Sequence, residues 1–503
     1  MASYMHGAAA GGRRGRKTAG PVDPYRIVFV TGALLLVLMV FMVPPMLVDM
    51  LRNNSDWEVF AGSALVTGFA GLMMVLVSRD AWSERVRLKE GFLLTVTSWL
   101  VLSLFASIPY LFLEDPGMSF PDAWFETVSG LTTTGSTVLS GLDTLPPGIL
   151  LWRSLTQWIG GVGIVVMALI MLPFLKVGGM QLFQTESSDR SDKIVPQARQ
   201  FIAFIAMTYI ALTAACALAY KLAGMGTFDA LNHAMTTLAT GGFSTHDASM
   251  GHFGNPAIHW LAALFMFAGS LPMVLYVRAA REWKLSIFRD PQVGGLIRIL
   301  LFIITLMTLW RIFATGREPL DALREVTFNV MAVISTTGFA LGDFTTWGML
   351  AVMAFFAMMF IGGCTGSTAG GLKIFRLQVM VMATQAYLKR LASPHRVVSI
   401  SYAGRPVTSE IAMSVFAFVS VLSASVLIFA VLIALSGVEF TTALSAAVTA
   451  VTNVGPGIGP VIGPAGNFAP LPDAAKILLG FAMLLGRLEF FTVLVVLSPQ
   501  FWK

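Results

Sequence analysis

Charged residues are scarce in this chain, and their scarcity excludes most classes of soluble protein. Only 12% of the 503 residues are Asp, Glu, Lys or Arg, whereas 56% are hydrophobic and the mean hydropathy is +0.76. Average soluble domains carry about twice that share of charge. Cysteine is nearly missing as well, because Cys216 and Cys364 stand alone in apolar sequence, so no disulfide framework is expected. The composition indicates a polytopic membrane protein.

Long apolar stretches are what the chain has instead. About 20 residues at a rise of about 1.5 Å each cover the hydrocarbon core of a bilayer. The stretches that meet this length are 27–50, 57–78, 92–113, 148–174, 199–220, 256–277, 295–315, 347–388, 408–436 and 473–500. The first follows a basic run but is too long for a signal peptide and ends at Pro44-Pro45 without a cleavage pattern.

Basic residues are distributed unevenly between the loops. If the N-terminus is cytoplasmic, outside loops contain only Arg52, Lys221, Arg317 and Arg324 of the 33 Lys and Arg residues. This positive-inside pattern predicts that both termini lie in the cytoplasm. The basic tail 1–26 is rich in Gly, Ala and Arg and is expected to be disordered. The positive-inside pattern also explains the net charge of +6. Membrane lipid is therefore the expected environment, and nucleic-acid binding is not needed to explain the charge.

Four polar segments interrupt the apolar pattern on the outside, at 119–138, 228–244, 321–340 and 439–457. Each is too long for a simple turn and too short or too polar to cross, so each is predicted to be re-entrant. Each ends in a Gly-centred turn, with Gly135, Gly242, Gly338 and Gly455 as anchors. The residues 13 positions upstream are predicted to start short helices, as N-caps or in the first turn: Asp122, Asp229, Glu325 and Thr442.

The four copies predict one architecture. Each short helix would direct the negative end of its dipole at its turn, and four such ends together favour a cation. We expect an all-α polytopic membrane protein in which four pseudo-repeats of helix, re-entrant pore helix with filter, and helix surround a central pore. The repeats occupy 92–174, 199–277, 295–388 and 408–500, after two additional N-terminal spans in 27–91. An ordinary Thr/Gly-rich loop explains any single turn, but not four in register.

The turns also resemble a known family. Thr240-Gly241-Gly242-Phe243-Ser244 and Asn453-Val454-Gly455-Pro456-Gly457 are similar to filter segments of the TrkH/KtrB/HKT superfamily of potassium transporters, and the fourth turn resembles the TrkH branch. The resemblance covers about 27–503 and implies K+ as substrate, bound by backbone carbonyls, with no covalent cofactor. The implied filter residues are Thr133, Thr134, Gly135, Thr240, Gly241, Gly242, Thr336, Thr337, Gly338, Asn453, Val454 and Gly455.

A second group of residues is implied to form a gate. The stretch 347–388 is interrupted at 362–371, which the family uses as an intramembrane loop below the filter; the alternative is a tightly packed helix interface. Arg487, deep in the last stretch, is implied to project into the pore; the alternatives are an ion pair, with Glu489 or with an acidic residue elsewhere, and snorkelling toward the cytoplasm. The loop residues are Gly362, Gly363, Thr365, Gly366, Ser367, Thr368, Gly370 and Gly371. Leu372 occupies the place of the phosphate-loop lysine, which excludes that motif.

Histidines are interpreted as structural. His233 lies nine residues before Gly242, where Glu126 and Asn329 occupy the matching places of the first and third copies, so this position is predicted to brace the filter. His246 is interpreted as structural or solvated. The Ser/His/Asp sets and metal spacings of enzymes are missing at membrane depth, so no enzyme is expected.

The resemblance also implies partners and a location. It implies a homodimer with one pore per protomer, and a cytosolic ring of TrkA-like nucleotide-binding subunits that docks on the basic loops. The membrane would be the bacterial inner membrane. The alternative function is a proton- or sodium-coupled carrier with poor K+/Na+ discrimination. Copies that run in one orientation, and the scarcity of intramembrane acids other than Glu489, disfavour it.

Overall fold

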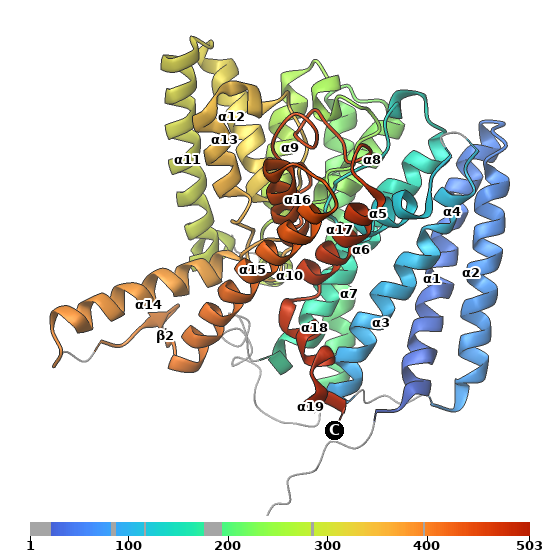
Figure 1. Cartoon of the computed structure of the whole chain (residues 1–503), viewed down its shortest axis with the longest axis horizontal. Coiled ribbons are helices and arrows are strands. Elements are labelled where there is room, and N and C mark those ends of the chain that lie inside the picture. Colours follow the sequence, from blue (N-terminus) through green and yellow to red (C-terminus); the bar gives the residue numbers. More distant parts are fainter. Residues whose placement is uncertain are drawn as a thin grey trace, which may run out of the picture.

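The computed structural model describes residues 22–81, 87–114, 117–175, 194–282, 286–395 and 398–502. Most of the tail 1–26 and of the loop 175–199 lies outside these residues. In the described part the chain is a bundle of helices (Figure 1), and its one sheet is a hairpin of β1, Ser401–Tyr402, with β2, Arg405–Pro406. Six described helices, and two further bent pairs, are long and apolar enough to span a bilayer. The expected all-α polytopic membrane protein is confirmed.

Two helices precede the repeated units and lie together at one edge of the bundle (Figure 1). They are α1, Pro24–Leu51, and α2, Trp57–Val77. Asp23 begins α1 by accepting a hydrogen bond from the Tyr25 N–H, and Pro24 suits the first helical position. The two backbones approach closely, since a Cβ atom added to Gly32 would lie 2.9 Å from the Gly71 oxygen.

The repeated units follow in chain order. The first contains α3, Leu88–Ala106, α4, Ile108–Leu111, α5, Phe120–Leu131, and α6, Pro147–Leu175. The second contains α7, Ile194–Leu222, α8, Thr227–Leu238, α9, Pro256–Gly269, and α10, Met273–Glu282. The third contains α11, Pro291–Thr315, α12, Pro319–Ile334, α13, Met349–Met358, and α14, Ile374–Ala392. The fourth contains α15, Ser409–Leu435, α16, Phe440–Thr452, α17, Asp473–Arg487, α18, Phe490–Leu497, and α19, Pro499–Trp502.

Short 3-10 turns connect some of these helices. They are η1, Arg79–Ala81, η2, Leu142–Thr144, η5, Ser249–His252, η6, Ser286–Arg289, and η7, Phe344–Trp347. Figure 1 shows α14 projecting beyond the bundle on the side where the C-terminus lies. The loops with η2 and η5 belong to the first and second units and meet outside the pore helices.

The short helices α5, α8, α12 and α16 begin earlier than predicted. Their N-caps are Ser119, Gly226, Glu318 and Glu439, so Asp122, Asp229 and Thr442 lie in the first turn, and Glu325 lies deeper in its helix. The prediction that these four residues are N-caps was wrong. Asp122, Asp229 and Thr442 fit the alternative of a first-turn position, and Glu325 fits neither. In α5 the Ser119 hydroxyl accepts from the Asp122 N–H and donates to its carboxylate.

The second long segments of three units are broken. A continuous span was expected over 256–277, but α9 and α10 meet at 91°, because Pro272 has no N–H to continue the helix. A continuous span was also expected over 473–500, but α17 and α18 meet at 108°, where Glu489 adopts a φ of +57°. In the third unit the helix stops at Met358 and resumes at Ile374.

Candidate functional site

The four pore helices α5, α8, α12 and α16 end in the same backbone shape. One or two positions after the last residue of each helix, a residue has a left-handed conformation, and so has the Gly two positions later. The first set is Thr133, Thr240, Thr336 and Asn453, with φ of 52°, 52°, 58° and 56°; the second is Gly135, Gly242, Gly338 and Gly455, with φ of 86°, 78°, 76° and 112°. A left-handed Thr costs about 1–3 kcal/mol. Strain recurs at equivalent places in all four units.

The turns contact one another in a closed ring. A Cβ atom added to the Gly of each turn would lie within 3 Å of the backbone oxygen of the middle residue in the next turn. The pairs are Gly135 with Gly241 O, Gly242 with Thr337 O, Gly338 with Val454 O, and Gly455 with Thr134 O, at 2.0, 1.9, 2.2 and 2.9 Å. The fourth turn therefore returns to the first, and all predicted filter residues lie in this ring, where only Gly leaves room for the neighbouring carbonyl.

Side chains fix individual turns within the ring. Asn453 Nδ2 donates to Thr134 Oγ1 at 2.9 Å and to Met483 O at 3.0 Å, which joins the fourth turn to the first and to α17. In the second turn, Gln157 of α6 donates to Gly241 O at 2.7 Å and accepts from the Phe243 N–H at 3.0 Å. Sequence reasoning missed Gln157, because a single amide in an apolar stretch does not reveal which turn it faces.

A hydrogen bond made by a polar side chain of each pore helix links that helix to the segment that follows its turn. Glu126 accepts from the Val138 N–H at 2.9 Å, His233 hydrogen-bonds with Ser244 Oγ at 3.0 Å, and Asn329 donates to Leu341 O at 3.1 Å. These are the three positions predicted to brace the filter. In the fourth unit, Ser445 donates to Ile458 O at 3.2 Å, one position before the matching Ala446.

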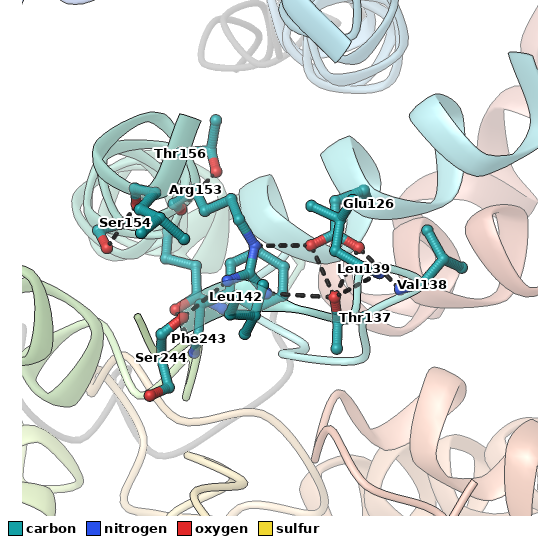
Figure 2. A network of polar contacts seen from close by, with 12 residues as sticks. Glu126, Thr137, Val138, Leu139, Leu142, Arg153, Ser154, Thr156, Phe243 and Ser244 are labelled. Atoms are coloured by element: carbon teal, nitrogen blue, oxygen red, sulfur yellow. Dashed lines mark hydrogen bonds and ion pairs between the residues drawn. The ribbon is translucent and has the colours of Figure 1, made fainter. Parts of the chain in front are cut away.

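A buried ion pair connects the first two turns (Figure 2). Arg153 of α6 donates from Nε to Glu126 Oε1 at 2.9 Å, and the two side chains are 1% and 0% exposed. The same guanidinium donates to Ser244 O at 2.7 Å and to Thr137 Oγ1 at 3.1 Å, and lies 4.2 Å from the centre of the Phe243 ring. Because the pair is desolvated, losing either charge would leave the other unbalanced.

A loop closes the inner side of the ring. This inner loop, residues 359–373, contains the loop residues that the resemblance implied to form a gate. Thr368 Oγ1 donates to Leu238 O at 3.0 Å, the Gly370 N–H donates to Thr336 Oγ1 at 2.6 Å, and the Gly371 N–H donates to Thr452 O at 2.9 Å. The inner loop is therefore bonded to the C-terminal ends of the second, third and fourth pore helices.

Arg487 supplies the contact to the first pore helix. It ends α17, is 5% exposed, and donates from Nη2 to both Thr133 Oγ1 and Thr368 O. The predicted alternative of an ion pair with Glu489 is wrong, since Glu489 is bonded to Arg376 at 2.6 Å. A buried positive charge therefore lies against the base of the ring and holds the inner loop there.

The rest of the inner loop is held by its own backbone and by the bend between α9 and α10. The Cys364 N–H donates to Ser270 O at 2.9 Å, and the Met273 N–H donates to Gly366 O at 3.1 Å. The Thr365 N–H donates to Gln292 Oε1 at 2.9 Å, and Ser367 donates to Cys364 O at 2.7 Å. Gly362 permits the fold of the loop, because a Cβ atom there would lie 2.0 Å from Gly370 O.

One cavity lies at the outer side of the ring of four turns, and a second lies at the inner loop. The outer cavity is lined by the four anchor Gly residues together with Arg153 and His246. The inner cavity is lined by Gly370, Lys373, Arg376, Arg487 and Glu489, among others. The first cavity is lined by the Gly residues of the ring, and the second by residues of the inner loop and of the segment around Arg487.

Comparison with known proteins assigns the chain to a family. The family model TrkH, cation transport protein, matches residues 59–503. This chain belongs to the TrkH family. The Trk system potassium uptake protein TrkI of Halomonas elongata is 46% identical over 480 residues, covering 95% of this chain and 96% of that protein. The Trk system potassium uptake protein TrkH of Escherichia coli K12 is 35% identical, covering 94% and 98%.

A solved structure is similar throughout. The crystal structure of the potassium transporter TrkH from Vibrio parahaemolyticus superposes with a TM-score of 0.88 at 34% identity, covering 96% of this chain and all of that one. The TrkH family comprises cation transport proteins, so this chain is a membrane transporter and not an enzyme. Both interpretations were made from the sequence and are confirmed.

Proposed function

We propose that this TrkH-family chain takes up K+ across the bacterial cytoplasmic membrane, down the electrochemical gradient, with both termini inside the cell. The names of the relatives support potassium as the substrate, since these are Trk system potassium uptake proteins that share 35–46% of their residues with this chain. The Lys and Arg distribution supports the orientation.

The observation that carries the proposal is the closed ring of four turns. Backbone carbonyls that replace the hydration shell are the means by which a pore selects K+. The middle carbonyls of the four turns follow one another around the ring, and four helix C-termini add partial negative charge. We assign K+ coordination to the carbonyls of 133–135, 240–242, 336–338 and 453–455.

The inner loop and Arg487 are proposed as the gate. A cation that leaves the ring toward the cytoplasm meets a guanidinium that is hydrogen-bonded to Thr133 and Thr368, and a loop bonded to the other three pore helices. Displacement of both would open the pathway. The proposed cause of opening is a cytosolic nucleotide-binding ring of the TrkA kind, which fits relatives that are named as parts of a Trk system.

Flux through purified protein tests the transport proposal. We expect wild-type proteoliposomes to take up 86Rb+, with K+ competing strongly and Na+ weakly. Gly135→Ser should lower the preference for K+ over Na+ at least about tenfold, because the new Cβ atom would lie about 2 Å from Gly241 O. Gly342→Ser is the matched control: its φ is +69°, but no atom lies within 4 Å of the added Cβ.

Three outcomes would count against the proposal. Wild-type vesicles without K+-competed uptake, with and without a regulatory partner, would contradict potassium transport. Equal selectivity of Gly135→Ser and Gly342→Ser would contradict the assignment of Gly135 to the filter. Uptake that follows an imposed proton or sodium gradient at a fixed K+ gradient would replace the gated pore with a coupled carrier.

A further inference from the structure

Two outer loops from different units meet at the rim of the outer cavity. The first loop carries Asp143 in η2, and the second carries His246 and His252 before and within η5. One ligand atom from each of these three side chains lies within 4.8 Å of the others. The separation of more than 100 residues between Asp143 and His246 explains why sequence reasoning interpreted His246 as merely structural or solvated.

Both histidine rings present Nδ1 to the carboxylate of Asp143. His246 Nδ1 donates to Asp143 Oδ1, and His252 Nδ1 lies 3.9 Å from the same oxygen. The two imidazole rings are stacked, with centroids 3.5 Å apart and planes within 3° of parallel. The Phe253 ring meets both histidine rings edge-on, at 5.6 and 5.2 Å. Both Nδ1 atoms therefore face one carboxylate oxygen from parallel rings, and one ring would turn out of the stack for both nitrogens to bind a single metal ion.

A second group of residues holds this arrangement in place. His246 Nε2 lies 3.5 Å from Asp229 Oδ1, which also accepts a hydrogen bond from Thr245 Oγ1 at 2.8 Å. Asp247 accepts from the Gly141 and Leu142 N–H groups, at 2.9 and 3.1 Å, and thereby fixes the loop that carries Asp143. A carboxylate that accepts a hydrogen bond from the far nitrogen of an imidazole is the usual support of a metal-binding histidine; Asp229 lies at that place, although His246 Nε2 makes no hydrogen bond to it here.

We propose that Asp143, His246 and His252 form an extracellular binding site for a divalent transition metal, for which Zn2+ is the probe. Two imidazoles and one carboxylate are ligands that suit Zn2+, and three protein ligands leave a fourth tetrahedral position for water. The metal would displace the proton that His246 shares with Asp143.

The position of the site gives it a consequence for transport. His246 lines the outer cavity together with the four anchor Gly residues of the ring. A bound dication there opposes the negative field of the helix ends and lowers the local concentration of K+. It also links the first unit to the second across their outer loops. Zinc is therefore expected to reduce uptake from outside.

Binding can be measured without transport. Zn2+ is titrated calorimetrically into tag-free full-length protein in lipid nanodiscs, for wild type, His252→Ala, Asp143→Asn and the control His395→Ala, an exposed histidine after α14. We expect one Zn2+ per chain in wild type and in the control, and at least about tenfold weaker binding in both site variants. Ca2+ should not compete. Wild-type binding no tighter than that of His252→Ala would overturn the site.

Folding and flux complete the test. His252 is 45% exposed at its side chain, so His252→Ala should retain the elution volume and melting temperature of wild type. With Zn2+ on both sides of proteoliposomes, 86Rb+ uptake should fall in wild type and in His395→Ala but not in His252→Ala. Binding without a difference in uptake would overturn the effect on transport. The zinc titration does not depend on which cation the pore carries. Its result can therefore be interpreted even if the proposed potassium uptake is wrong.

Discussion

At the scale of single residues, the proposed filter consists of turns with paired left-handed residues, and the side chains around these turns determine whether those conformations persist. Three of the strained positions are Thr, which is β-branched and disfavours positive φ, and the fourth is Asn453, which tolerates it better. Such strain lasts only when the surroundings hold it. The pair Arg153–Glu126 and the amide of Gln157 are the strongest of these supports.

The Arg153–Glu126 pair yields a stability prediction. Glu126→Gln should lower the free energy of unfolding by about 3 kcal/mol, because it leaves a buried guanidinium uncompensated. The double variant Glu126→Gln with Arg153→Met should recover part of that loss. The control is Asp321→Asn, which breaks the partly exposed pair with Arg324 and should cost less than about 1 kcal/mol. Unfolding in mixed micelles with SDS measures all of them, and equal losses would show that the buried pair is not special.

Sequence reasoning predicted the residues of the ring better than the residues that support the ring. Register among four copies identified the Gly anchors and the bracing position, since each copy repeats the same local pattern. Arg153 was recognised only as a charge near the edge of a span, and no local pattern relates it to Glu126 or Ser244. The site at Asp143, His246 and His252 was missed for the same reason, because it forms only between two units.

At the scale of secondary-structure elements, the broken helices matter most. All three breaks lie at the inner loop. Met273 at the bend after α9 and Arg487 at the bend after α17 donate hydrogen bonds to the loop, and the loop itself fills the gap between α13 and α14. Hydropathy alone predicts continuous spans at the two bends, because Pro272 and Glu489 are single residues in long apolar runs. Gly, Ser and Thr are dense only in the third unit, so only that interruption was visible beforehand.

The inner loop yields a prediction about basal transport. Arg487→Met keeps a long side chain but removes the charge and its bonds to Thr133 and Thr368, so uptake in the absence of a cytosolic partner should rise several-fold. Deleting Gly366–Ala369 should have the same effect. Arg298→Met, at an exposed arginine of α11, is the control and should leave uptake unchanged. The measurement is 86Rb+ uptake into proteoliposomes, and low uptake by folded variants would exclude the loop as the barrier.

At the scale of the whole molecule, one chain supplies all four turns of the ring, so the proposed pathway does not require a second chain. The predicted class, an all-α polytopic membrane protein, is confirmed. It could be predicted because the length of apolar stretches and the distribution of charge are read directly from the sequence. The number of chains in an assembly cannot be read from the sequence in this way, because it depends on the shape of a lipid-facing surface. Homodimerisation therefore remains a proposal drawn from resemblance.

Mass determination tests that proposal directly. Native mass spectrometry of the protein released from nanodiscs should give twice the chain mass of 54.1 kDa. Dilution over about a hundredfold range of protein concentration should not change the result, because obligate interfaces are large and apolar. A single-chain mass at every concentration, from protein that still takes up 86Rb+, would show that one protomer is sufficient.

Because the four turns belong to one polypeptide, a single codon change alters one side of the pathway and leaves the other three as they were. In a channel of four identical chains, the same change would appear on every side at once. The ring at Gly135, Gly242, Gly338 and Gly455 can therefore be varied in graded steps, one quarter at a time. Selection could therefore adjust cation preference in small steps in this chain, whereas in a symmetric tetramer every substitution is repeated on all four sides.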